Sequence, residues 1–204
     1  MSDSPFDVVA RLSADSDGLA LNFYRHGDRY GHFFGLGEEP PVLTSVDLSA
    51  EMETESGPAS PVFQEVHEEE LPQGHSLMTV GQWGKIHYSA VFLQQNGGRF
   101  DCDIAARVRS ATDLNMASTY TLRATAIDLT EISSESIVCR LGQGRTLRIS
   151  TGPGTELVMT TAGHAGLRIQ IFPSKAAIPA GLPGASSRTI RWSYAIELEK
   201  TTEM

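Results

Sequence analysis

The sequence predicts an all-β protein, an antiparallel β-sandwich of roughly ten strands with little or no helix. Apolar and polar residues alternate in segment after segment, as they do along strands that have one buried and one exposed face. The clearest stretch has an apolar side chain at every second position: Ile190, Trp192, Tyr194, Ile196 and Leu198. Glycine and proline separate these segments, and no helical pattern extends over about twelve residues. Two packed sheets are the common way to bury so many half-apolar strands, and a β-barrel is the alternative.

The N-terminal segments predict a lead-in followed by a hairpin. Residues 1–18 are polar without sustained alternation, so we expect a loosely ordered lead-in to a single domain over residues 19–200. Alternation over residues 19–36 is interrupted at Gly27, where a positive φ has little steric cost. This segment therefore predicts a hairpin with its turn near that glycine.

The next segments predict one strand and one ambiguous element. Alternation over residues 42–48 indicates a strand. Ser60-Pro61 could begin a short helix, because proline suits a first helical turn, but residues 62–66 are equally compatible with a strand. Both interpretations remain open from the sequence.

The central segments contain the best hairpin signal of the chain. Residues 77–84 lead into a strand over residues 85–94 that carries apolar side chains on both faces. Asn96-Gly97-Gly98 then predicts a tight turn into a strand over residues 100–108. Further strands are expected over residues 119–129, 136–141, 146–150, 156–161 and 166–172. A long loop over residues 178–187 precedes the final strand.

Composition excludes several classes of protein. A chain of 204 residues with 40% hydrophobic residues can bury the core of one sizeable domain. Residues 1–100 carry 5 Lys+Arg against 15 Asp+Glu, which would repel a phosphate backbone, so no nucleic-acid partner is expected. No run approaches the ~20 apolar residues of a membrane helix, and the acidic N-terminal segment is unlike a secretory signal. We therefore expect a cytoplasmic protein without a membrane partner.

The two cysteines are expected to be buried free thiols. Cys102 and Cys139 both lie on the apolar face of a predicted strand, where cysteine packs as a small hydrophobic residue. A disulfide between neighbouring strands is the alternative if the chain is exported.

One short motif resembles a known family. Arg25-His26-Gly27, followed by Arg29, resembles the RHG signature of histidine phosphatases. The resemblance implies that His26 accepts a phosphoryl group, that Arg25 and Arg29 hold its oxygens, and that His164 is a second active-site histidine. That family is α/β and places its nucleophile at a strand-to-helix junction, whereas a returning strand is predicted after Arg29. The pattern favours a structural turn with His26 pointing outward.

Histidines and carboxylates form two further clusters along the chain. His26, Asp28 and His32 lie close together in sequence, and His67 and His75 flank a run of glutamates. Neither spacing matches a metal-binding signature, so no metal and no cofactor are predicted. His32 also fits a hydrogen-bonded histidine in the core.

The strongest candidate for a ligand site surrounds Trp83. Glycines on both sides of this tryptophan allow a backbone or a ligand to approach closely. His87 shares a strand face with Lys85 and Ser89, so these three side chains and the Trp83 indole could bind a sugar or another small polar ligand. The structural interpretation is that Trp83 closes one end of the sandwich.

Three functional hypotheses follow. The leading one is a non-catalytic module that binds a small ligand or a protein through Trp83, His87 and neighbouring loops. The second is an enzyme acting on a carbohydrate or a phosphate ester by histidine acid–base chemistry, with these candidates: His26, His67, His87 and His164. The third is a structural module that forms homo-oligomers through its sheet edges. Asp101 and Asp103 share a strand face with Arg107 and Arg109, which predicts a ladder of opposite charges and not a catalytic pair.

Overall fold

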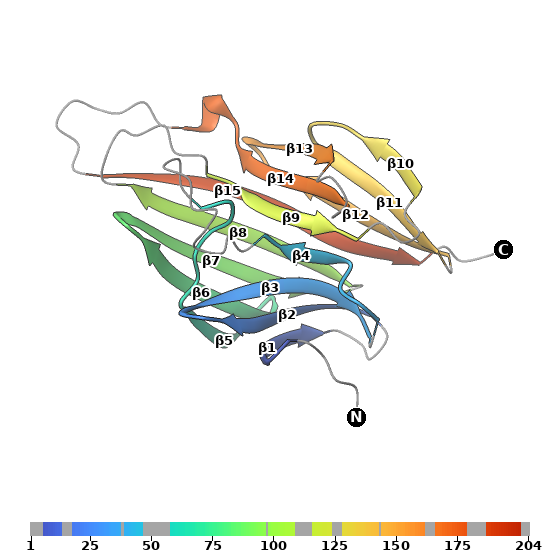
Figure 1. The fold of residues 1–204 in the computed structure, drawn as a ribbon, viewed down its shortest axis with the longest axis horizontal. Coiled ribbons are helices and arrows are strands. Elements are labelled where there is room, and N and C mark those ends of the chain that lie inside the picture. Colours follow the sequence, from blue (N-terminus) through green and yellow to red (C-terminus); the bar gives the residue numbers. More distant parts are fainter. Residues whose placement is uncertain are drawn as a thin grey trace.

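The predicted β-sandwich is confirmed. The computed structural model describes residues 6–13, 18–37, 39–46, 58–96, 98–108, 116–123, 128–142, 144–161, 166–178 and 187–200. Two antiparallel sheets of seven and eight strands lie face to face, and neither sheet closes on itself (Figure 1). The structure describes more strands than the roughly ten expected, because part of the N-terminal lead-in forms a strand and the segment expected over residues 119–129 forms two.

The elements follow one another along the chain in this order: β1 (Val8–Ser13), β2 (Leu19–His26), β3 (Arg29–Leu36), β4 (Leu43–Ser45), β5 (Glu65–Leu71), β6 (Gly74–Trp83), β7 (Ile86–Gln95), β8 (Arg99–Val108), β9 (Ser118–Leu122), β10 (Asp128–Ile132), β11 (Ser136–Gly142), β12 (Arg145–Thr151), β13 (Thr155–Thr161), β14 (Leu167–Pro173), the 3₁₀ turn η3 (Lys175–Ala177) and β15 (Arg188–Lys200). Among the described residues, no helix is long and apolar enough to cross a membrane.

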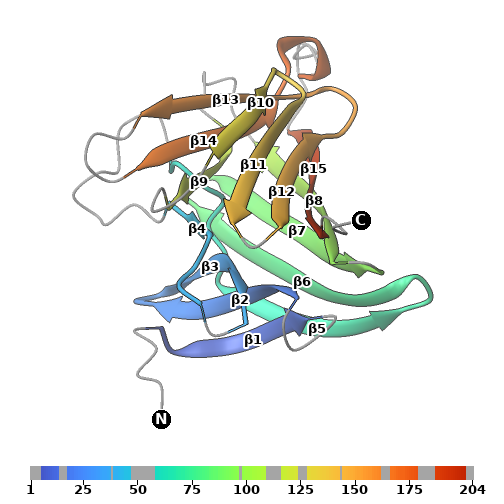
Figure 2. The ribbon, with the colours of Figure 1, turned by 90° about the vertical axis from the view of Figure 1, so that its right-hand side faces the viewer.

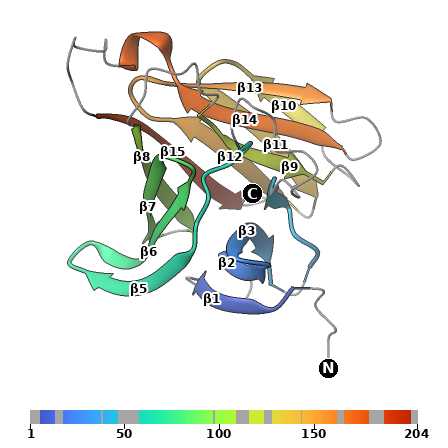
Figure 3. The same ribbon diagram turned by 60° about the vertical axis from the view of Figure 1, so that its left-hand side comes forward.

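The chain passes repeatedly between the two sheets. The seven-stranded sheet has the order β1-β2-β3-β4-β9-β14-β13, and the eight-stranded sheet has the order β10-β11-β12-β15-β8-β7-β6-β5. Figure 2 shows the two layers from the side, and Figure 3 shows β5 and β6 reaching the neighbourhood of β1 to β3. A β-bridge between Tyr30 and Phe63 joins this region. The long strand β15 lies inside the eight-stranded sheet, between β12 and β8.

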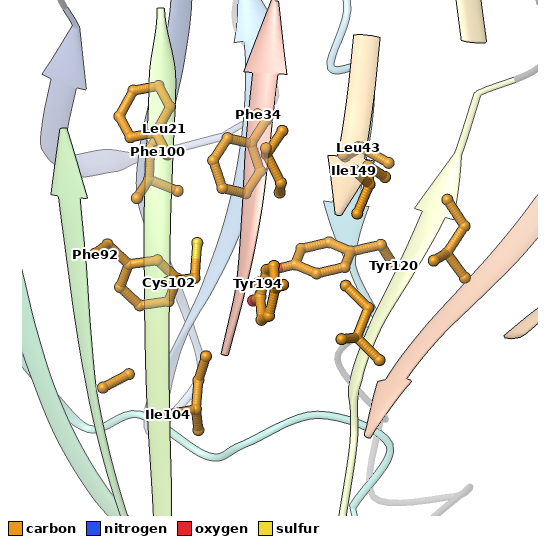
Figure 4. Close-up of a cluster of buried hydrophobic side chains, with 14 of the residues drawn as sticks. Leu21, Phe34, Leu43, Phe92, Phe100, Cys102, Ile104, Tyr120, Ile149 and Tyr194 are labelled. Carbon is orange, nitrogen blue, oxygen red and sulfur yellow. The ribbon is translucent and has the colours of Figure 1, made fainter. Parts of the chain in front are cut away.

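Aromatic side chains from both sheets form the centre of the core. The ring centroids of Phe23 and Phe92 lie 5.4 Å apart, and those of Phe34 and Phe100 lie 5.6 Å apart. All four side chains are fully buried. Figure 4 shows Phe34, Phe92 and Phe100 together with the aliphatic side chains that complete this layer. The alternation read from the sequence therefore places one face of each strand in a shared interior.

Both predicted hairpins form. Strands β2 and β3 pair from Leu19↔Leu36 to His26↔Arg29, with Gly27 at φ 63° in the turn. Strands β7 and β8 pair from Ile86↔Val108 to Gln95↔Arg99. Turn chemistry and alternation agree in these two places, which is why the sequence located them correctly.

The N-terminal lead-in contains an element that was not predicted. Residues 8–13 of the expected lead-in form β1, which pairs with β2 through a register shift between Val8 and Ala10. This edge strand exposes Val8 and Val9, so its polar and apolar positions do not alternate cleanly. Residues 1–5 and 14–17 lie outside the described residues.

Two other segments were ambiguous or differ from the prediction. Of the two interpretations left open for residues 62–66, the helix does not form: Phe63 makes a β-bridge and Glu65 begins the edge strand β5. The strand expected over residues 119–129 is two strands, β9 and β10, which belong to different sheets. Residues 124–127 between them lie outside the described residues.

Candidate functional site

The outer face of the eight-stranded sheet carries the candidate site. Along β7, Ile86, Tyr88, Ala90 and Phe92 are buried, so the intervening side chains point away from the core. Strand pairing aligns Ser89 with Ala105 of β8, and Ala105 with Arg191 of β15. Small side chains in the middle of this face leave room between longer ones on either side.

Two adjoining cavities lie on this face. The large cavity, of about 660 Å³, is formed by β7, β8, β15 and the turn between β12 and β13. The small cavity, of about 560 Å³, is formed by β6, β7, β8, β15 and the start of β5. Arg191 lines both cavities, so we treat them together as one groove. Its size suits an extended ligand of several rings.

The turn between β12 and β13 is held firmly at the wall of the large cavity. The backbone N–H of Gly152 donates to the carbonyl oxygen of Ser193 at 2.8 Å. The backbone N–H of Ser193 donates to Thr155 Oγ1 at 3.1 Å. A Cβ atom at position 152 would lie 2.1 Å from Ser193 Oγ and 3.2 Å from the Ser193 carbonyl oxygen, so a larger residue there would require the serine hydroxyl to rotate away.

Charges in the large cavity are balanced. Arg99 Nε lies 2.9 Å from Asp101 Oδ1, and Arg99 Nη1 lies 3.4 Å from Glu197 Oε2. Arg191 Nη1 lies 3.8 Å from Asp103 Oδ2. The predicted charge ladder is thus partly correct. The arginines that pair with Asp101 and Asp103 are Arg99 on the same strand and Arg191 on β15. Carboxylates held in this way serve as hydrogen-bond acceptors.

The small cavity has a different charge pattern. His87, Arg107 and Arg191 line it together with a single carboxylate, that of Glu65. Arg107 Nε donates to the hydroxyl of Ser187 at 3.2 Å. Glu65 Oε2 lies 3.3 Å from His67 Nε2 and is largely exposed. Positive groups therefore outnumber negative ones among the residues lining this cavity.

The candidates around Trp83 are divided between two faces of the sheet. His87 and Ser89 line the small cavity, whereas Trp83 pairs with the buried Ile86 and packs, half-buried, against the core. Lys85 is exposed in the turn between β6 and β7. The structure thus places His87 and Ser89 together and separates Trp83 from them.

Both glycines beside Trp83 have structural roles. A Cβ atom on Gly81 would lie 2.2 Å from the carbonyl oxygen of Val62, so this glycine admits the backbone of a neighbouring segment. Gly84 has a φ of 55° and forms the turn into β7. The close approach that the sequence indicated is therefore to protein backbone.

The residues of the RHG motif lie in the β2–β3 hairpin. Arg25 and His26 end β2, and Arg29 begins β3, so the chain runs from strand to strand as the sequence indicated. Arg29 Nε donates to Asp28 Oδ1 at 3.1 Å, and this hydrogen bond lowers the pKa of the Asp28 carboxyl. His164 lies outside the described residues. His67 is exposed on β5, which belongs to the other sheet and contacts β3.

Sequence reasoning missed a buried polar network between the sheets. His32 Nε2 lies 2.8 Å from the hydroxyl oxygen of Tyr120, which lies 2.5 Å from that of Tyr194 (Figure 4 shows the two tyrosines). Burial lowers the pKa of His32 to about 3 and raises the pKa of both tyrosines well above the usual value. His32 is therefore a neutral core histidine, as one interpretation of the sequence suggested. The tyrosines gave no sequence signal because they alternate like any core residue.

Both cysteines are buried and free. Burial raises the pKa of the Cys139 thiol to about 11, and burial also raises the pKa of the Cys102 thiol well above its usual value. The interpretation of two buried free thiols agrees with this placement. Thiols held in this protonated state are poor nucleophiles.

Comparisons with known proteins identify the fold alone. No family model matches the chain, and no curated protein matches it. The fold is similar to that of two solved structures of a heparinase III gene product, one of them with methylated lysines, with TM-scores of 0.55 and 0.54 and sequence identities of 9% and 8%. Each match covers 94% of this chain and 34% of the heparinase chain, so this chain spans about a third of the length of those proteins.

Proposed function

We propose that this protein is a non-catalytic binding module that holds a carbohydrate chain in the groove on the outer face of its eight-stranded sheet. The observation that carries the proposal is the pair of adjoining cavities, of about 660 and 560 Å³, that share Arg191. An elongated ligand with many hydroxyl groups fits a groove lined by arginine, aspartate, serine and glutamine side chains.

The fold likeness supports the same class of ligand. The similar structures are named as heparinase III, an enzyme that acts on a carbohydrate. Sandwich folds host many functions, so the likeness adds weight only together with the groove.

Binding is favoured over catalysis by the placement of the acid–base groups. The hypothesis of histidine acid–base chemistry requires two histidines that converge with a carboxylate in one cleft. Of the five histidines in the described part of the chain, only His87 lines either cavity of the groove. The carboxylates of Asp101 and Asp103 face arginines, which suits hydrogen bonding to a ligand.

An array of immobilised neutral and acidic oligosaccharides tests the proposal. Ala105→Trp fills the floor of the small cavity without removing a polar contact, and Ser89→Tyr fills it from an exposed position on β7. The matched control is Val158→Trp, which introduces the same tryptophan side chain at an exposed position on the other sheet.

The expected result is binding of at least one oligosaccharide class by the wild type and by Val158→Trp. Both groove variants should lose most of that affinity while their melting temperatures stay within a few degrees of the wild type. The proposal is wrong if no oligosaccharide binds, or if Ala105→Trp and Ser89→Tyr bind as tightly as the wild type.

A further inference from the structure

Three nitrogen-bearing side chains gather in the small cavity. His87 on β7 is directly paired with Arg107 on β8, which is paired with Thr189 on β15. Arg191 lies two residues beyond Thr189 on the same face. Cβ atoms of directly paired residues are about 5 Å apart and those of diagonal neighbours about 7–8 Å, so these long side chains can reach one small group together.

The positive charge of the two arginines is incompletely neutralised by the described residues. Arg107 has a hydroxyl as its hydrogen-bond partner, at 3.2 Å in Ser187. Arg191 faces Asp103 at 3.8 Å, and both side chains are more than half exposed. Exposed ion pairs at this distance contribute little to stability, so the arginine can readily exchange its carboxylate partner for another anion.

Two other arginines on the same sheet face are matched more closely. Arg99 lies 2.9 Å from Asp101, and Arg148 lies 3.0 Å from Glu199. Arg140, on β11, faces Asp128 at 3.7 Å in an exposed pair comparable to that of Arg191 with Asp103. The whole protein carries a net charge of −9, so a cavity that is lined by two arginines and a single carboxylate stands out against its surroundings. Like charges placed side by side on a sheet are unfavourable without an anion between them.

The cavity also offers no exposed aromatic face for stacking. Tyr88 lines the small cavity but is only 4% exposed, and the Trp192 and Tyr194 rings of the large cavity point into the core. Sugar recognition by the described lining residues must therefore rest on hydrogen bonds and charge.

Resting on the proposed function, we infer that the small cavity is an anion subsite and that the ligand is an acidic oligosaccharide. Its carboxylate or sulfate group is held by Arg107 and Arg191, whose planar guanidinium groups match two oxygens at once. His87 supplies a further hydrogen-bonding nitrogen beside Arg107. The adjoining large cavity, which offers the carboxylates of Asp101 and Asp103 as hydrogen-bond acceptors, receives the neighbouring part of the sugar chain.

Isothermal titration with matched ligands tests this inference. The carboxylate arm uses an oligogalacturonate and its carboxyl-reduced form, and the sulfate arm uses a heparin-derived oligosaccharide and its desulfated form. The variants are Arg107→Gln and Arg191→Gln, and the control is Arg140→Gln, which removes an arginine from the same sheet face outside the groove.

We expect the acidic form in at least one arm to bind about tenfold or more tightly than its neutral counterpart, as for hydrogen bonds to a charged group. Arg107→Gln and Arg191→Gln should each remove most of that difference, whereas Arg140→Gln should retain it. Equal losses in all three variants would indicate general attraction of a polyanion and would overturn the anion subsite.

The two proposals fail in different ways. If acidic and neutral forms bind equally and Ala105→Trp abolishes both, the groove binds carbohydrate but the anion subsite is wrong. If neither form binds to the wild type in either arm while another oligosaccharide of the array does, the anion subsite is wrong and the proposed function stands. If nothing on the array binds either, both fail.

Discussion

The hydroxyl oxygens of Tyr120 and Tyr194 lie 2.5 Å apart and join the two sheets across the middle of the core. Tyr120 belongs to β9 and Tyr194 to β15, and both side chains are almost completely buried. His32 extends this contact at 2.8 Å from Tyr120, and Trp192 Nε1 donates to Ser118 Oγ at 3.0 Å nearby. Buried polar groups that satisfy one another in this way fix the register between two sheets that apolar contacts alone would leave free to slide.

Tyr120→Phe should destabilise the protein more than Tyr194→Phe. The first change removes the hydroxyl that contacts both His32 and Tyr194, whereas the second leaves the contact between His32 and Tyr120 intact. We expect Tyr120→Phe to lower the free energy of unfolding by about 1–3 kcal/mol, because buried polar atoms lose their partner. Urea unfolding followed by tryptophan fluorescence measures the difference. A change of only a few tenths of a kcal/mol would contradict the role given to the network.

The burial of His32 predicts a specific loss of stability in acid. Its pKa falls from 6.5 to about 3 on folding because the aromatic interior disfavours the charged form. Between these values the unfolded state binds the extra proton, so the free energy of unfolding decreases as the pH falls from 6.5 towards 3. The slope attributable to this group is on the order of 1.4 kcal/mol per pH unit.

His32→Gln isolates this contribution, because glutamine can still contact Tyr120 but does not titrate in this range. Chemical unfolding at a series of pH values should show a steeper decline for the wild type than for the variant between pH 6 and 4. Carboxylate protonation affects both proteins and cancels in the comparison. Parallel curves would show that His32 does not titrate on unfolding.

The two glycines beside Trp83 should tolerate substitution very differently. Gly81→Ala places a Cβ atom 2.2 Å from the carbonyl oxygen of Val62, so the segment around Val62 and Phe63 must move. We expect a loss of roughly 2–3 kcal/mol, as in an overpacked core. Gly84→Ala meets no atom within 4 Å and should cost only the ~1–2 kcal/mol of a left-handed alanine. Thermal melts of both variants measure this order, and the reverse order would contradict it.

Substitutions of Trp83 and His87 should affect different properties, stability in the first case and ligand binding in the second. Trp83→Ala removes a half-buried ring that packs against the core, so we expect a loss of roughly 1–3 kcal/mol in stability and unchanged affinity for the oligosaccharide. His87→Ala alters an exposed side chain of the small cavity, so it should weaken binding and leave the melting temperature nearly unchanged. Titration and melting of each variant under the same conditions check both. If Trp83→Ala bound the oligosaccharide more weakly at a temperature well below its melting temperature, the tryptophan would be part of the binding site.

Some parts of the candidate site were predictable from local sequence and others were not. The alternation along residues 86–95 placed His87 and Ser89 on one face, and strand pairing confirmed that arrangement. The same pattern could not show that Arg191, about a hundred residues later, completes the cavity, because pairing between β8 and β15 depends on the path of the whole chain. The sequence pattern groups Trp83 with His87. In the structure the turn at Gly84 puts the two side chains on opposite faces of the sheet, which alternation within one strand does not reveal.

The sequence by itself determined that this chain forms layered antiparallel strands, because side-chain alternation and glycine-rich turns are local properties of the backbone. It also determined which face of most strands is buried and that both cysteines lie on buried faces. Only the tertiary structure decided the order of strands within the two sheets, the tyrosine contact across the core and the lining of one cavity by both Arg107 and Arg191. Those features join residues far apart in the chain, and they arise from the packing of whole sheets against each other.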